Sequence, residues 1–454
     1  MATQTSTYSV FSPGSYSRFT YIERHTDDVN RILNALWRPG YLISVVGPTK
    51  MGKTVLLNTA VADAYYIEGA WIDKLSDLWS RLASQLEIPT NEAGTRTTEN
   101  SSSWGLSAKL KALFADAAVE VSGSQTKALA RGWSKDVPAD QAVSAAFGIL
   151  ADSDTNPVII IDDFHFIPPS VRADVVAALK GICARGATCV LVTLPHHRNE
   201  AVSQVQDMIG RSTTVHMREW SIDDLIAIGR AGFESLNLVD DGESIATLLA
   251  SESYGSPQLM QYLCSMLVAD VNAQYHKSEE PYELDHPADW DDFFRSAVEP
   301  RSVEWLQKFI AGPAVRGRDR TLYRLTDSRS LDGYKLIFEG LKQQGPELET
   351  SYNSLKASIL ALLDDNTLDN FNRIQLSTKL NHITRIASTS LSALHELDQE
   401  NEELPSDKNP PQGPSSNFQP LFEYIPDRGG EIHILEPYLA YALKWGSDHL
   451  LEEE

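Results

Sequence analysis

The 454-residue chain has few cysteines, little positive charge and no long apolar run. Its three cysteines (Cys183, Cys189 and Cys264) are an odd number in apolar segments. This argues against a disulfide framework or a zinc site and fits a reducing compartment. Because no run of about 18 apolar residues occurs, we expect no membrane span. The first 19 residues lack the basic and apolar regions of a secretory signal, so we expect a cytoplasmic protein.

Positive charge is scarce: 39 Lys and Arg stand against 62 Asp and Glu, which gives a formal net charge of −23 and a pI near 4.9. A wide basic face, the usual feature of a general nucleic-acid binder, is therefore not expected. Hydrophobic residues make up 42% of the chain, an ordinary value for a globular protein. The length predicts about three domains of ~150 residues each.

Five short apolar runs are predicted to be strands, with helical patterns between them. This alternation predicts an α/β fold with a parallel sheet. Residues 89–135 begin with a polar, turn-rich stretch and are interpreted as an insertion between the second and third strands. The expected strands are Tyr41–Val46, Ala64–Ile72, Val158–Ile161, Thr188–Val192 and Thr213–Met217.

A glycine-rich segment directly after the first expected strand matches G-x-x-x-x-G-K-[ST], the phosphate-loop pattern. Glycines let the backbone curl so that its N–H groups face a phosphate chain, and the following helix directs its positive end to the anion. Lys53 is expected to contact the β- and γ-phosphates of ATP, and the Thr54 hydroxyl to bind Mg²⁺. The candidate nucleotide-binding residues are Gly47, Pro48, Thr49, Lys50, Met51, Gly52, Lys53, Thr54 and Val55.

The third expected strand ends in two carboxylates, Asp162 and Asp163, at the edge where α/β sheets bind ligands. Asp162 is expected to hold Mg²⁺, and Asp163 to polarise the attacking water as a general base. The alternative is a pair that caps the following helix. His165 either lines the site or fills a packing niche.

Other side chains are candidates for contact with the γ-phosphate. Thr193 ends the fourth expected strand, where a hydroxyl can bond to the phosphate or to the attacking water; Arg198, in the next loop, is the alternative. Arg211 precedes the fifth strand and is a candidate arginine finger directed at a neighbouring subunit. Arg218 is a second candidate for that role, with a plain surface charge as its alternative.

The turn Tyr254-Gly-Ser-Pro257 precedes a further helical pattern. Pro suits the first turn of a helix. The start of this helix either covers the nucleotide base or is a plain helix start.

These features, in this order, resemble AAA+-like and STAND ATPases over about residues 10–270. The resemblance includes a lead-in, Phe19–Arg24, in which Glu23 replaces the usual Gly. It implies that, of this lead-in, the backbone of Tyr21 and Ile22 and the side chain of Arg24 lie against adenine, and that Pro257 touches it as well. The helix after Pro257 has no Arg between positions 258 and 269, which argues against a processive motor.

The C-terminal region resembles the winged helix that follows this core in prokaryotic STAND and archaeal-type ATPases. Residues 352–454 hold seven Lys and Arg against 17 Asp and Glu, which favours a protein contact over DNA because phosphate neutralisation dominates DNA affinity. The expected helices are Tyr352–Leu363, Ile374–Asn381 and Ile383–Glu400, and the wing strands are Phe422–Tyr424 and Glu431–Leu435.

Five arginines concentrate positive charge upstream of this region. They either contact an acidic partner, nucleic acid or a neighbouring subunit's nucleotide, or pair with local carboxylates. They are Arg316, Arg318, Arg320, Arg324 and Arg329.

The sequence thus predicts a P-loop NTPase core (1–218), a helical lid (219–290), a helical and basic connector (291–350) and a winged-helix domain (351–454). The expected function is an ATP- and Mg²⁺-dependent switch that hydrolyses ATP slowly and forms homo-oligomers or engages an effector protein. The resemblance suggests prokaryotic antiviral defence. Two alternatives are a DNA-associated AAA+ regulator of transposition or replication, and a scaffold with a degenerate nucleotide site.

Overall fold

The computed structural model describes residues 5–88, 138–152, 156–194, 210–313, 320–364, 374–389, 420–426 and 429–452. The expected insertion, Arg198, Arg316 and Arg318 lie outside these ranges. Contacts divide the chain into two compact units. The first unit comprises residues 1–23, 49–51 and 219–454, and the second comprises residues 24–48 and 52–218. The expected core of 1–218 therefore differs from this division, since residues 1–23 group with the first unit.

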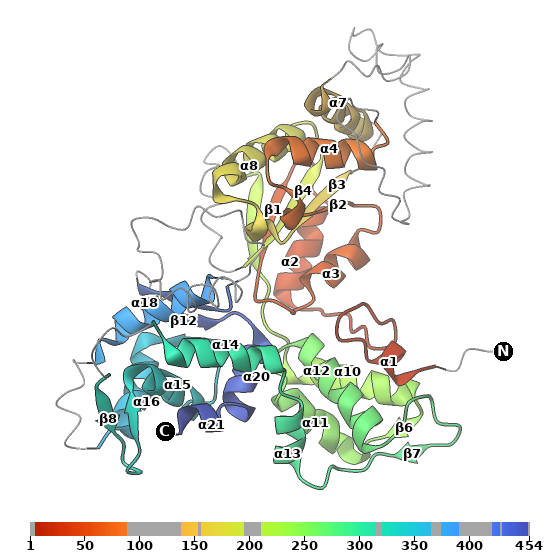
Figure 1. Ribbon diagram of the computed structural model, residues 1–454. Coiled ribbons are helices and arrows are strands. Elements are labelled where there is room, and N and C mark those ends of the chain that lie inside the picture. Colours follow the sequence, from red (N-terminus) through yellow and green to blue (C-terminus); the bar gives the residue numbers. More distant parts are fainter. Residues whose placement is uncertain are drawn as a thin grey trace, which may run out of the picture. The chain divides into compact units, whose positions relative to one another are not determined.

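The second unit is built on a five-stranded parallel sheet of order β2-β3-β4-β1-β5 (Figure 1). All five expected strands are present, and the predicted α/β fold class is confirmed. β1, β3 and β4 are buried along their whole length, as expected for apolar strands covered on both faces. The strands are β1 (Leu42–Val46), β2 (Tyr65–Glu68), β3 (Val158–Asp162), β4 (Thr188–Thr193) and β5 (Ser212–His216).

Helices cover both faces of this sheet, because successive strand side chains point to opposite sides. Side chains of α2 and α3 pack with one set, which includes Ile43 and Ile160. Side chains of α4, α7 and α8 pack with the other set, which includes Ile159 and Ile161. Figure 1 shows α2 and α3 on one side of the sheet and α4, α7 and α8 on the other. The helices are α2 (Asp27–Leu36), α3 (Lys53–Ala60), α4 (Leu75–Gln85), α7 (Ala139–Asp152) and α8 (Pro169–Cys183).

The second strand is shorter than expected. β2 ends at Glu68, and Gly69–Trp71 forms a 3-10 turn, η1, in place of the strand predicted to reach Ile72. The chain passes so close to β3 here that a Cβ on Gly69 would lie 2.3 Å from the carbonyl oxygen of Asp163. Only glycine fits this approach, and the strand turns away at that point.

One part of the first unit is a helical cluster. Helices α10, α11 and α12 share a buried core with α1, α13 and Tyr441 of α20, and α12 continues into a π-helix, η5. The bounds are α1 (Thr7–Val10), α10 (Ile222–Ser235), α11 (Ser244–Ser251), α12 (Pro257–Met266), η5 (Leu267–Val271) and α13 (Trp290–Ser296). Two short strands, β6 (Leu238–Val239) and β7 (Tyr282–Glu283), pair beside them.

A second core of this unit joins helices to a three-stranded antiparallel sheet of order β10-β12-β11. The expected wing strands are present as β11 and β12, and β10 adds a third. The elements are α14 (Pro300–Ala311), β8 (Leu322–Arg324), β9 (Ser330–Asp332), α15 (Gly333–Gln343), β10 (Glu349–Ser351), α16 (Tyr352–Leu362), α18 (Leu376–Ala387), β11 (Phe422–Ile425), β12 (Glu431–Ile434), α20 (Pro437–Trp445) and α21 (Asp448–Leu451).

Two expectations for this region change. The break predicted between Asn381 and Ile383 is wrong, because α18 runs through both, with Leu380 and Ile383 buried on one face. Of the clustered arginines, Arg320 pairs with Asp332, and Arg329 pairs with Asp327 and Glu339. For these two the alternative of local pairing therefore holds.

Candidate nucleotide site

The segment Gly47–Thr54 connects β1 to α3, as the phosphate-loop pattern predicts. A Cβ on Gly47 would lie 2.8 Å from the carbonyl oxygen of Met217, so the chain needs glycine where it leaves the sheet. Lys50 and Gly52 both have left-handed backbone, with φ of +58° and +80°. The loop therefore curls back on itself and delivers Lys53 as the first residue of α3.

Lys53 is buried, with an 8% exposed surface, and its amine lies inside the curl of the loop. Nζ donates to the carbonyl oxygens of Gly47 at 2.9 Å and Pro48 at 2.5 Å. Burial lowers the pKa of Lys53 to about 8, although the charges of Asp162 and Asp163 act in the opposite direction. A positive group at this place is suited to polyphosphate, which would replace the carbonyl oxygens as its partner.

Asp162 ends β3 and lies beside the first turn of α3. Its Oδ2 accepts a hydrogen bond from Thr54 Oγ1 at 2.5 Å and another from the Tyr66 hydroxyl. Its Oδ1 accepts the backbone N–H of Asp163 at 2.9 Å. The two predicted metal ligands, Thr54 and Asp162, are thus in direct contact, and a hydroxyl with a carboxylate is a donor set that suits Mg²⁺.

Asp163 differs from its neighbour in exposure and backbone. Its side chain is 51% exposed, and its φ of +49° is left-handed. Partial burial, together with the Asp162 and Glu68 carboxylates, raises the pKa of Asp163 to about 6, against the lowering effect of Lys53. His165 Nδ1 lies 4.0 Å from Asp163 Oδ1, and the His165 ring is buried and packs on Phe166.

Thr193 and Arg211 lie at opposite ends of their strands. Thr193 ends β4 beside Val46, its carbonyl accepts Gly47 N–H at 3.3 Å, and its buried Oγ1 has no hydrogen-bond partner among the residues that the structure describes. Arg211 precedes β5, whose first residue pairs with Leu42 at the start of β1. Arg211 therefore lies at the amino ends of the strands, whereas the phosphate loop lies at their carboxyl ends. Thr193 is therefore beside the loop, whereas Arg211 is about 13 Å away along β1, at about 3.3 Å per residue.

The tip of the loop, residues 49–51, groups with the first unit and is held there by α20. Lys50 Nζ lies 2.8 Å from Glu436 Oε1 and 4.3 Å from the centre of the Tyr438 ring. Thr49 Oγ1 donates to the Leu435 carbonyl at 2.9 Å and contacts Glu436 Oε2 at 3.3 Å. Glu436 is 8% exposed and also caps α20 by accepting Tyr438 N–H.

Further contacts within the first unit involve the loop backbone. Trp220 Nε1 donates to the Met51 carbonyl at 3.0 Å, and Ser256 Oγ donates to the Lys50 carbonyl at 3.3 Å. Met51 itself is fully buried. Pro257 is buried at the first position of α12, next to Ser256. The predicted turn therefore adjoins the loop tip through Ser256.

Two site residues escaped the sequence interpretation: Tyr66, on β2, and Glu436, at the start of α20. Tyr66 stands in a run of apolar residues and carries no motif. Glu436 directly precedes Pro437, and a carboxylate at that position is expected only to cap a helix. The strand alternation of β2 would have placed Tyr66 on the face of Asp162 had the register been known.

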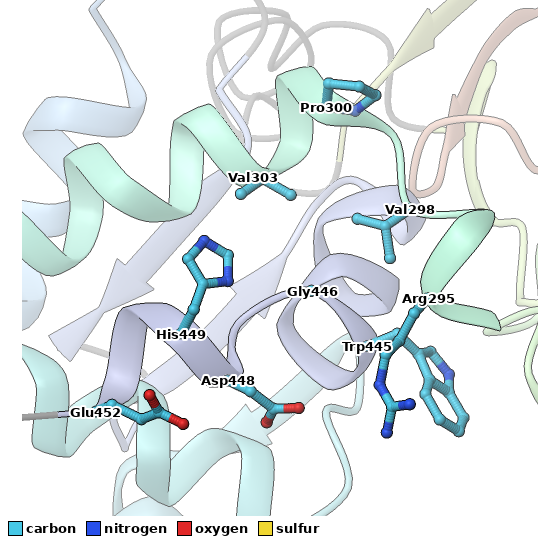
Figure 2. Close-up of a pocket in the computed structure, with 9 residues that line it drawn as sticks. All are labelled: Arg295, Val298, Pro300, Val303, Trp445, Gly446, Asp448, His449 and Glu452. Carbon is cyan, nitrogen blue, oxygen red and sulfur yellow. The ribbon is translucent and has the colours of Figure 1, made fainter. Parts of the chain in front are cut away.

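A surface pocket of about 550 Å³ lies elsewhere, in the first unit between α13 and α14 on one side and α20 and α21 on the other (Figure 2). Two of its charged groups have partners: Arg295 pairs with Asp291 and Asp292, and Asp448 pairs with Lys342. None of its lining residues belongs to the phosphate loop. The candidate nucleotide site therefore consists of the loop and the strand ends and does not include this pocket.

The parallel sheet of order β2-β3-β4-β1-β5, with the phosphate loop after β1 and the carboxylates after β3, defines the class of the second unit. This arrangement is the fold of a P-loop NTPase core. Within the described ranges, no helix has the length and apolar character needed to cross a membrane.

No known family model matches the chain, and no curated protein matches it. Several solved structures are similar to it. Cdc6p from Pyrobaculum aerophilum is 13% identical, covering 96% of this chain and 97% of its own, with a TM-score of 0.39. ORC2 from Aeropyrum pernix, in ADPNP–ADP complexes, is 13% identical, covering 97% of each chain, with a TM-score of 0.44. A STAND protein with a tetratricopeptide repeat sensor from Pyrococcus horikoshii is 11% identical, covering 84% of this chain and 50% of its own, with a TM-score of 0.33. Likeness of this degree assigns no ligand or partner to the present chain.

Proposed function

We propose that this chain binds ATP with Mg²⁺, hydrolyses it slowly and acts as a nucleotide-dependent switch. The observation that carries the proposal is that the Lys53 amine lies inside the curl of the loop, while the next residue, Thr54, contacts Asp162 at the end of β3. A lysine inside a curled glycine loop, with a hydroxyl and a carboxylate at its exit, provides for a phosphate chain and its metal together.

The roles of the residues follow from their positions. Backbone N–H groups of the loop and the start of α3 bind the phosphates, and Lys53 neutralises their charge. Thr54 and Asp162 would hold Mg²⁺, which when bound neutralises charge that develops on the phosphates. Asp163, half-exposed and more basic than an ordinary carboxylate, accepts a proton from water. The buried hydroxyl of Thr193 donates to the γ-phosphate or to that water.

The switch rests on the loop tip. Thr49 and Lys50 are tied to Leu435 and Glu436 of the C-terminal region, so a change in the loop on binding phosphate strains these bonds directly. We propose that the nucleotide state thereby alters the C-terminal region. Its surface then forms homo-oligomers or engages an effector protein, in a role such as prokaryotic antiviral defence. The winged-helix identity of residues 351–454 belongs to this proposal.

Replacement of Lys53 tests the ATP site. Lys53→Ala removes a buried charge that donates to phosphate, and bonds to charged groups contribute about 1.5–3 kcal/mol. We expect the affinity for ATP with Mg²⁺ to fall by about 10- to 100-fold in calorimetry. Lys180→Ala, on α8 of the same unit, is the control and should leave the affinity unchanged. Equal affinity for wild type and Lys53→Ala would refute the phosphate-loop assignment.

A further inference from the structure

The Tyr66 hydroxyl contacts the carboxylate of Asp162 from the neighbouring strand. In the register of β2 and β3, Tyr66 lies opposite Ile160, and Glu68 lies opposite Asp162. Tyr66 and Asp162 therefore share one face of the sheet as diagonal neighbours, a separation that the long Tyr66 side chain crosses. That face is the one covered by α3, which carries Thr54.

Three donors account for the orientation of this carboxylate. The backbone of Asp163 holds Oδ1, while Thr54 and Tyr66 both donate to Oδ2. Tyr66 is itself fixed, because its ring packs in the core under α2 and α3 and its carbonyl accepts Gln85 Nε2 at 2.5 Å. Of the two donors to Oδ2, Tyr66 is the one that does not bind the metal in the proposed function. Its bond can therefore persist when Thr54 turns to Mg²⁺.

We propose that Tyr66 is a positioning residue for the magnesium-binding carboxylate of Asp162. The inference rests on the proposed function. A carboxylate at the end of a strand can rotate about its side-chain bonds, and a fixed donor on Oδ2 restricts it to the orientation that faces Thr54. Removal of a residue that hydrogen-bonds to a metal ligand typically lowers metal affinity or activity by about 10- to 100-fold.

The adjacent residue supplies a matched control. Tyr65 lies on the same strand but faces the opposite side, where its ring packs edge-on against Phe147 with centroids 5.1 Å apart. Its hydroxyl is buried and, within the described part of the chain, has no hydrogen-bond partner. Tyr65→Phe and Tyr66→Phe thus each remove one buried or half-buried hydroxyl from β2, but only Tyr66→Phe removes a bond to Asp162.

The test measures ATP affinity by calorimetry twice for each protein, with Mg²⁺ and with EDTA. The dissociation constant in EDTA divided by that in Mg²⁺ reports how much the metal strengthens ATP binding. In Tyr66→Phe we expect this ratio to fall about tenfold, with the affinity in EDTA unchanged. The Mg²⁺ concentration that gives half-maximal ATP turnover should rise by a similar factor. Tyr65→Phe should match wild type in both measurements.

The outcomes separate the two proposals. If wild type binds no ATP, or binds it equally with Mg²⁺ and with EDTA, the proposed function fails. If wild type gains affinity from Mg²⁺ and Tyr66→Phe gains as much, the positioning role is overturned while the proposed function stands. An equal loss by Tyr66→Phe in Mg²⁺ and in EDTA would show a packing role instead and would also overturn it.

Discussion

Adjacent carboxylates at the end of β3 have different environments. Asp162 is 3% exposed and accepts three hydrogen bonds, whereas Asp163 is half-exposed and lies beside two other carboxylates, Asp162 and Glu68. Three donors orient the Asp162 carboxylate, while burial and like charges disfavour the charged form of Asp163. One group is thus suited to hold a cation and the other to accept a proton.

This difference predicts a pH dependence for turnover. As a general base Asp163 acts only when deprotonated, and its pKa is raised to about 6. We therefore expect kcat/KM, which reports the free enzyme, to rise with pH through about 6 and level off above it. Asp163→Asn should bind ATP, and its turnover should be about 100-fold or more lower. The rise of kcat/KM with pH should be absent in this variant. ATP affinity measured at the same pH values is the control; a wild-type rate in Asp163→Asn would place the base elsewhere.

The sequence predicts the residues of this site that lie next to one another along the chain or at strand ends. Lys53 and Thr54 follow from the loop pattern, and Asp162 and Thr193 follow from the rule that parallel strands end at one edge. Tyr66 could not be predicted, because its contact depends on the register between β2 and β3, which are separated by 89 residues. The contact of Lys50 with Glu436 spans 386 positions and has no local signal.

At the scale of elements, the turn η1 brings the chain after β2 close to the backbone of Asp162 and Asp163. A Cβ on Gly69 would lie 2.3 Å from the Asp163 carbonyl oxygen and 3.1 Å from that of Asp162. We expect Gly69→Ala to shift β3, lowering the melting temperature by several degrees and reducing turnover. Gly181→Ala, in α8, meets no atom within 4 Å and should raise stability by about 0.5–1 kcal/mol. Equal melting temperatures for the two variants would contradict this account.

The start of α20 is the element that holds the loop tip. Glu436→Gln keeps an acceptor for the helix cap but removes the charge paired with Lys50. We expect a fluorescent ADP analogue to dissociate about tenfold faster from this variant, because a bond to a charged group constrains the loop. Glu299 offers a close control, since it also caps a helix that begins with proline, α14. Glu299→Gln should release the analogue at the wild-type rate. Equal rates for wild type and Glu436→Gln would show that the contact between Lys50 and Glu436 has no part in the proposed switch.

For the whole molecule, the net charge of −23 disfavours the DNA-associated alternative, and the proposed finger role of Arg211 would need a second copy of the chain. Arg211 lies at the amino ends of the strands, and the phosphate loop lies at their carboxyl ends. Arg211 therefore cannot reach phosphates bound by its own loop unless the sheet is rearranged. A finger role therefore requires another subunit, which ATP would have to bring into place.

Molar mass by light scattering tests this assembly. The Asp163→Asn variant should form a defined oligomer with ATP and Mg²⁺ and remain smaller with ADP, because it keeps the bound ATP. A mixture of Lys53→Ala with Arg211→Ala should then recover turnover that neither variant shows alone, since one supplies the finger and the other the intact loop. An unchanged mass together with an inactive mixture would exclude shared sites. A mass increase that needs duplex DNA and disappears with salt would instead support the DNA-associated regulator, because phosphate contacts weaken steeply with ionic strength.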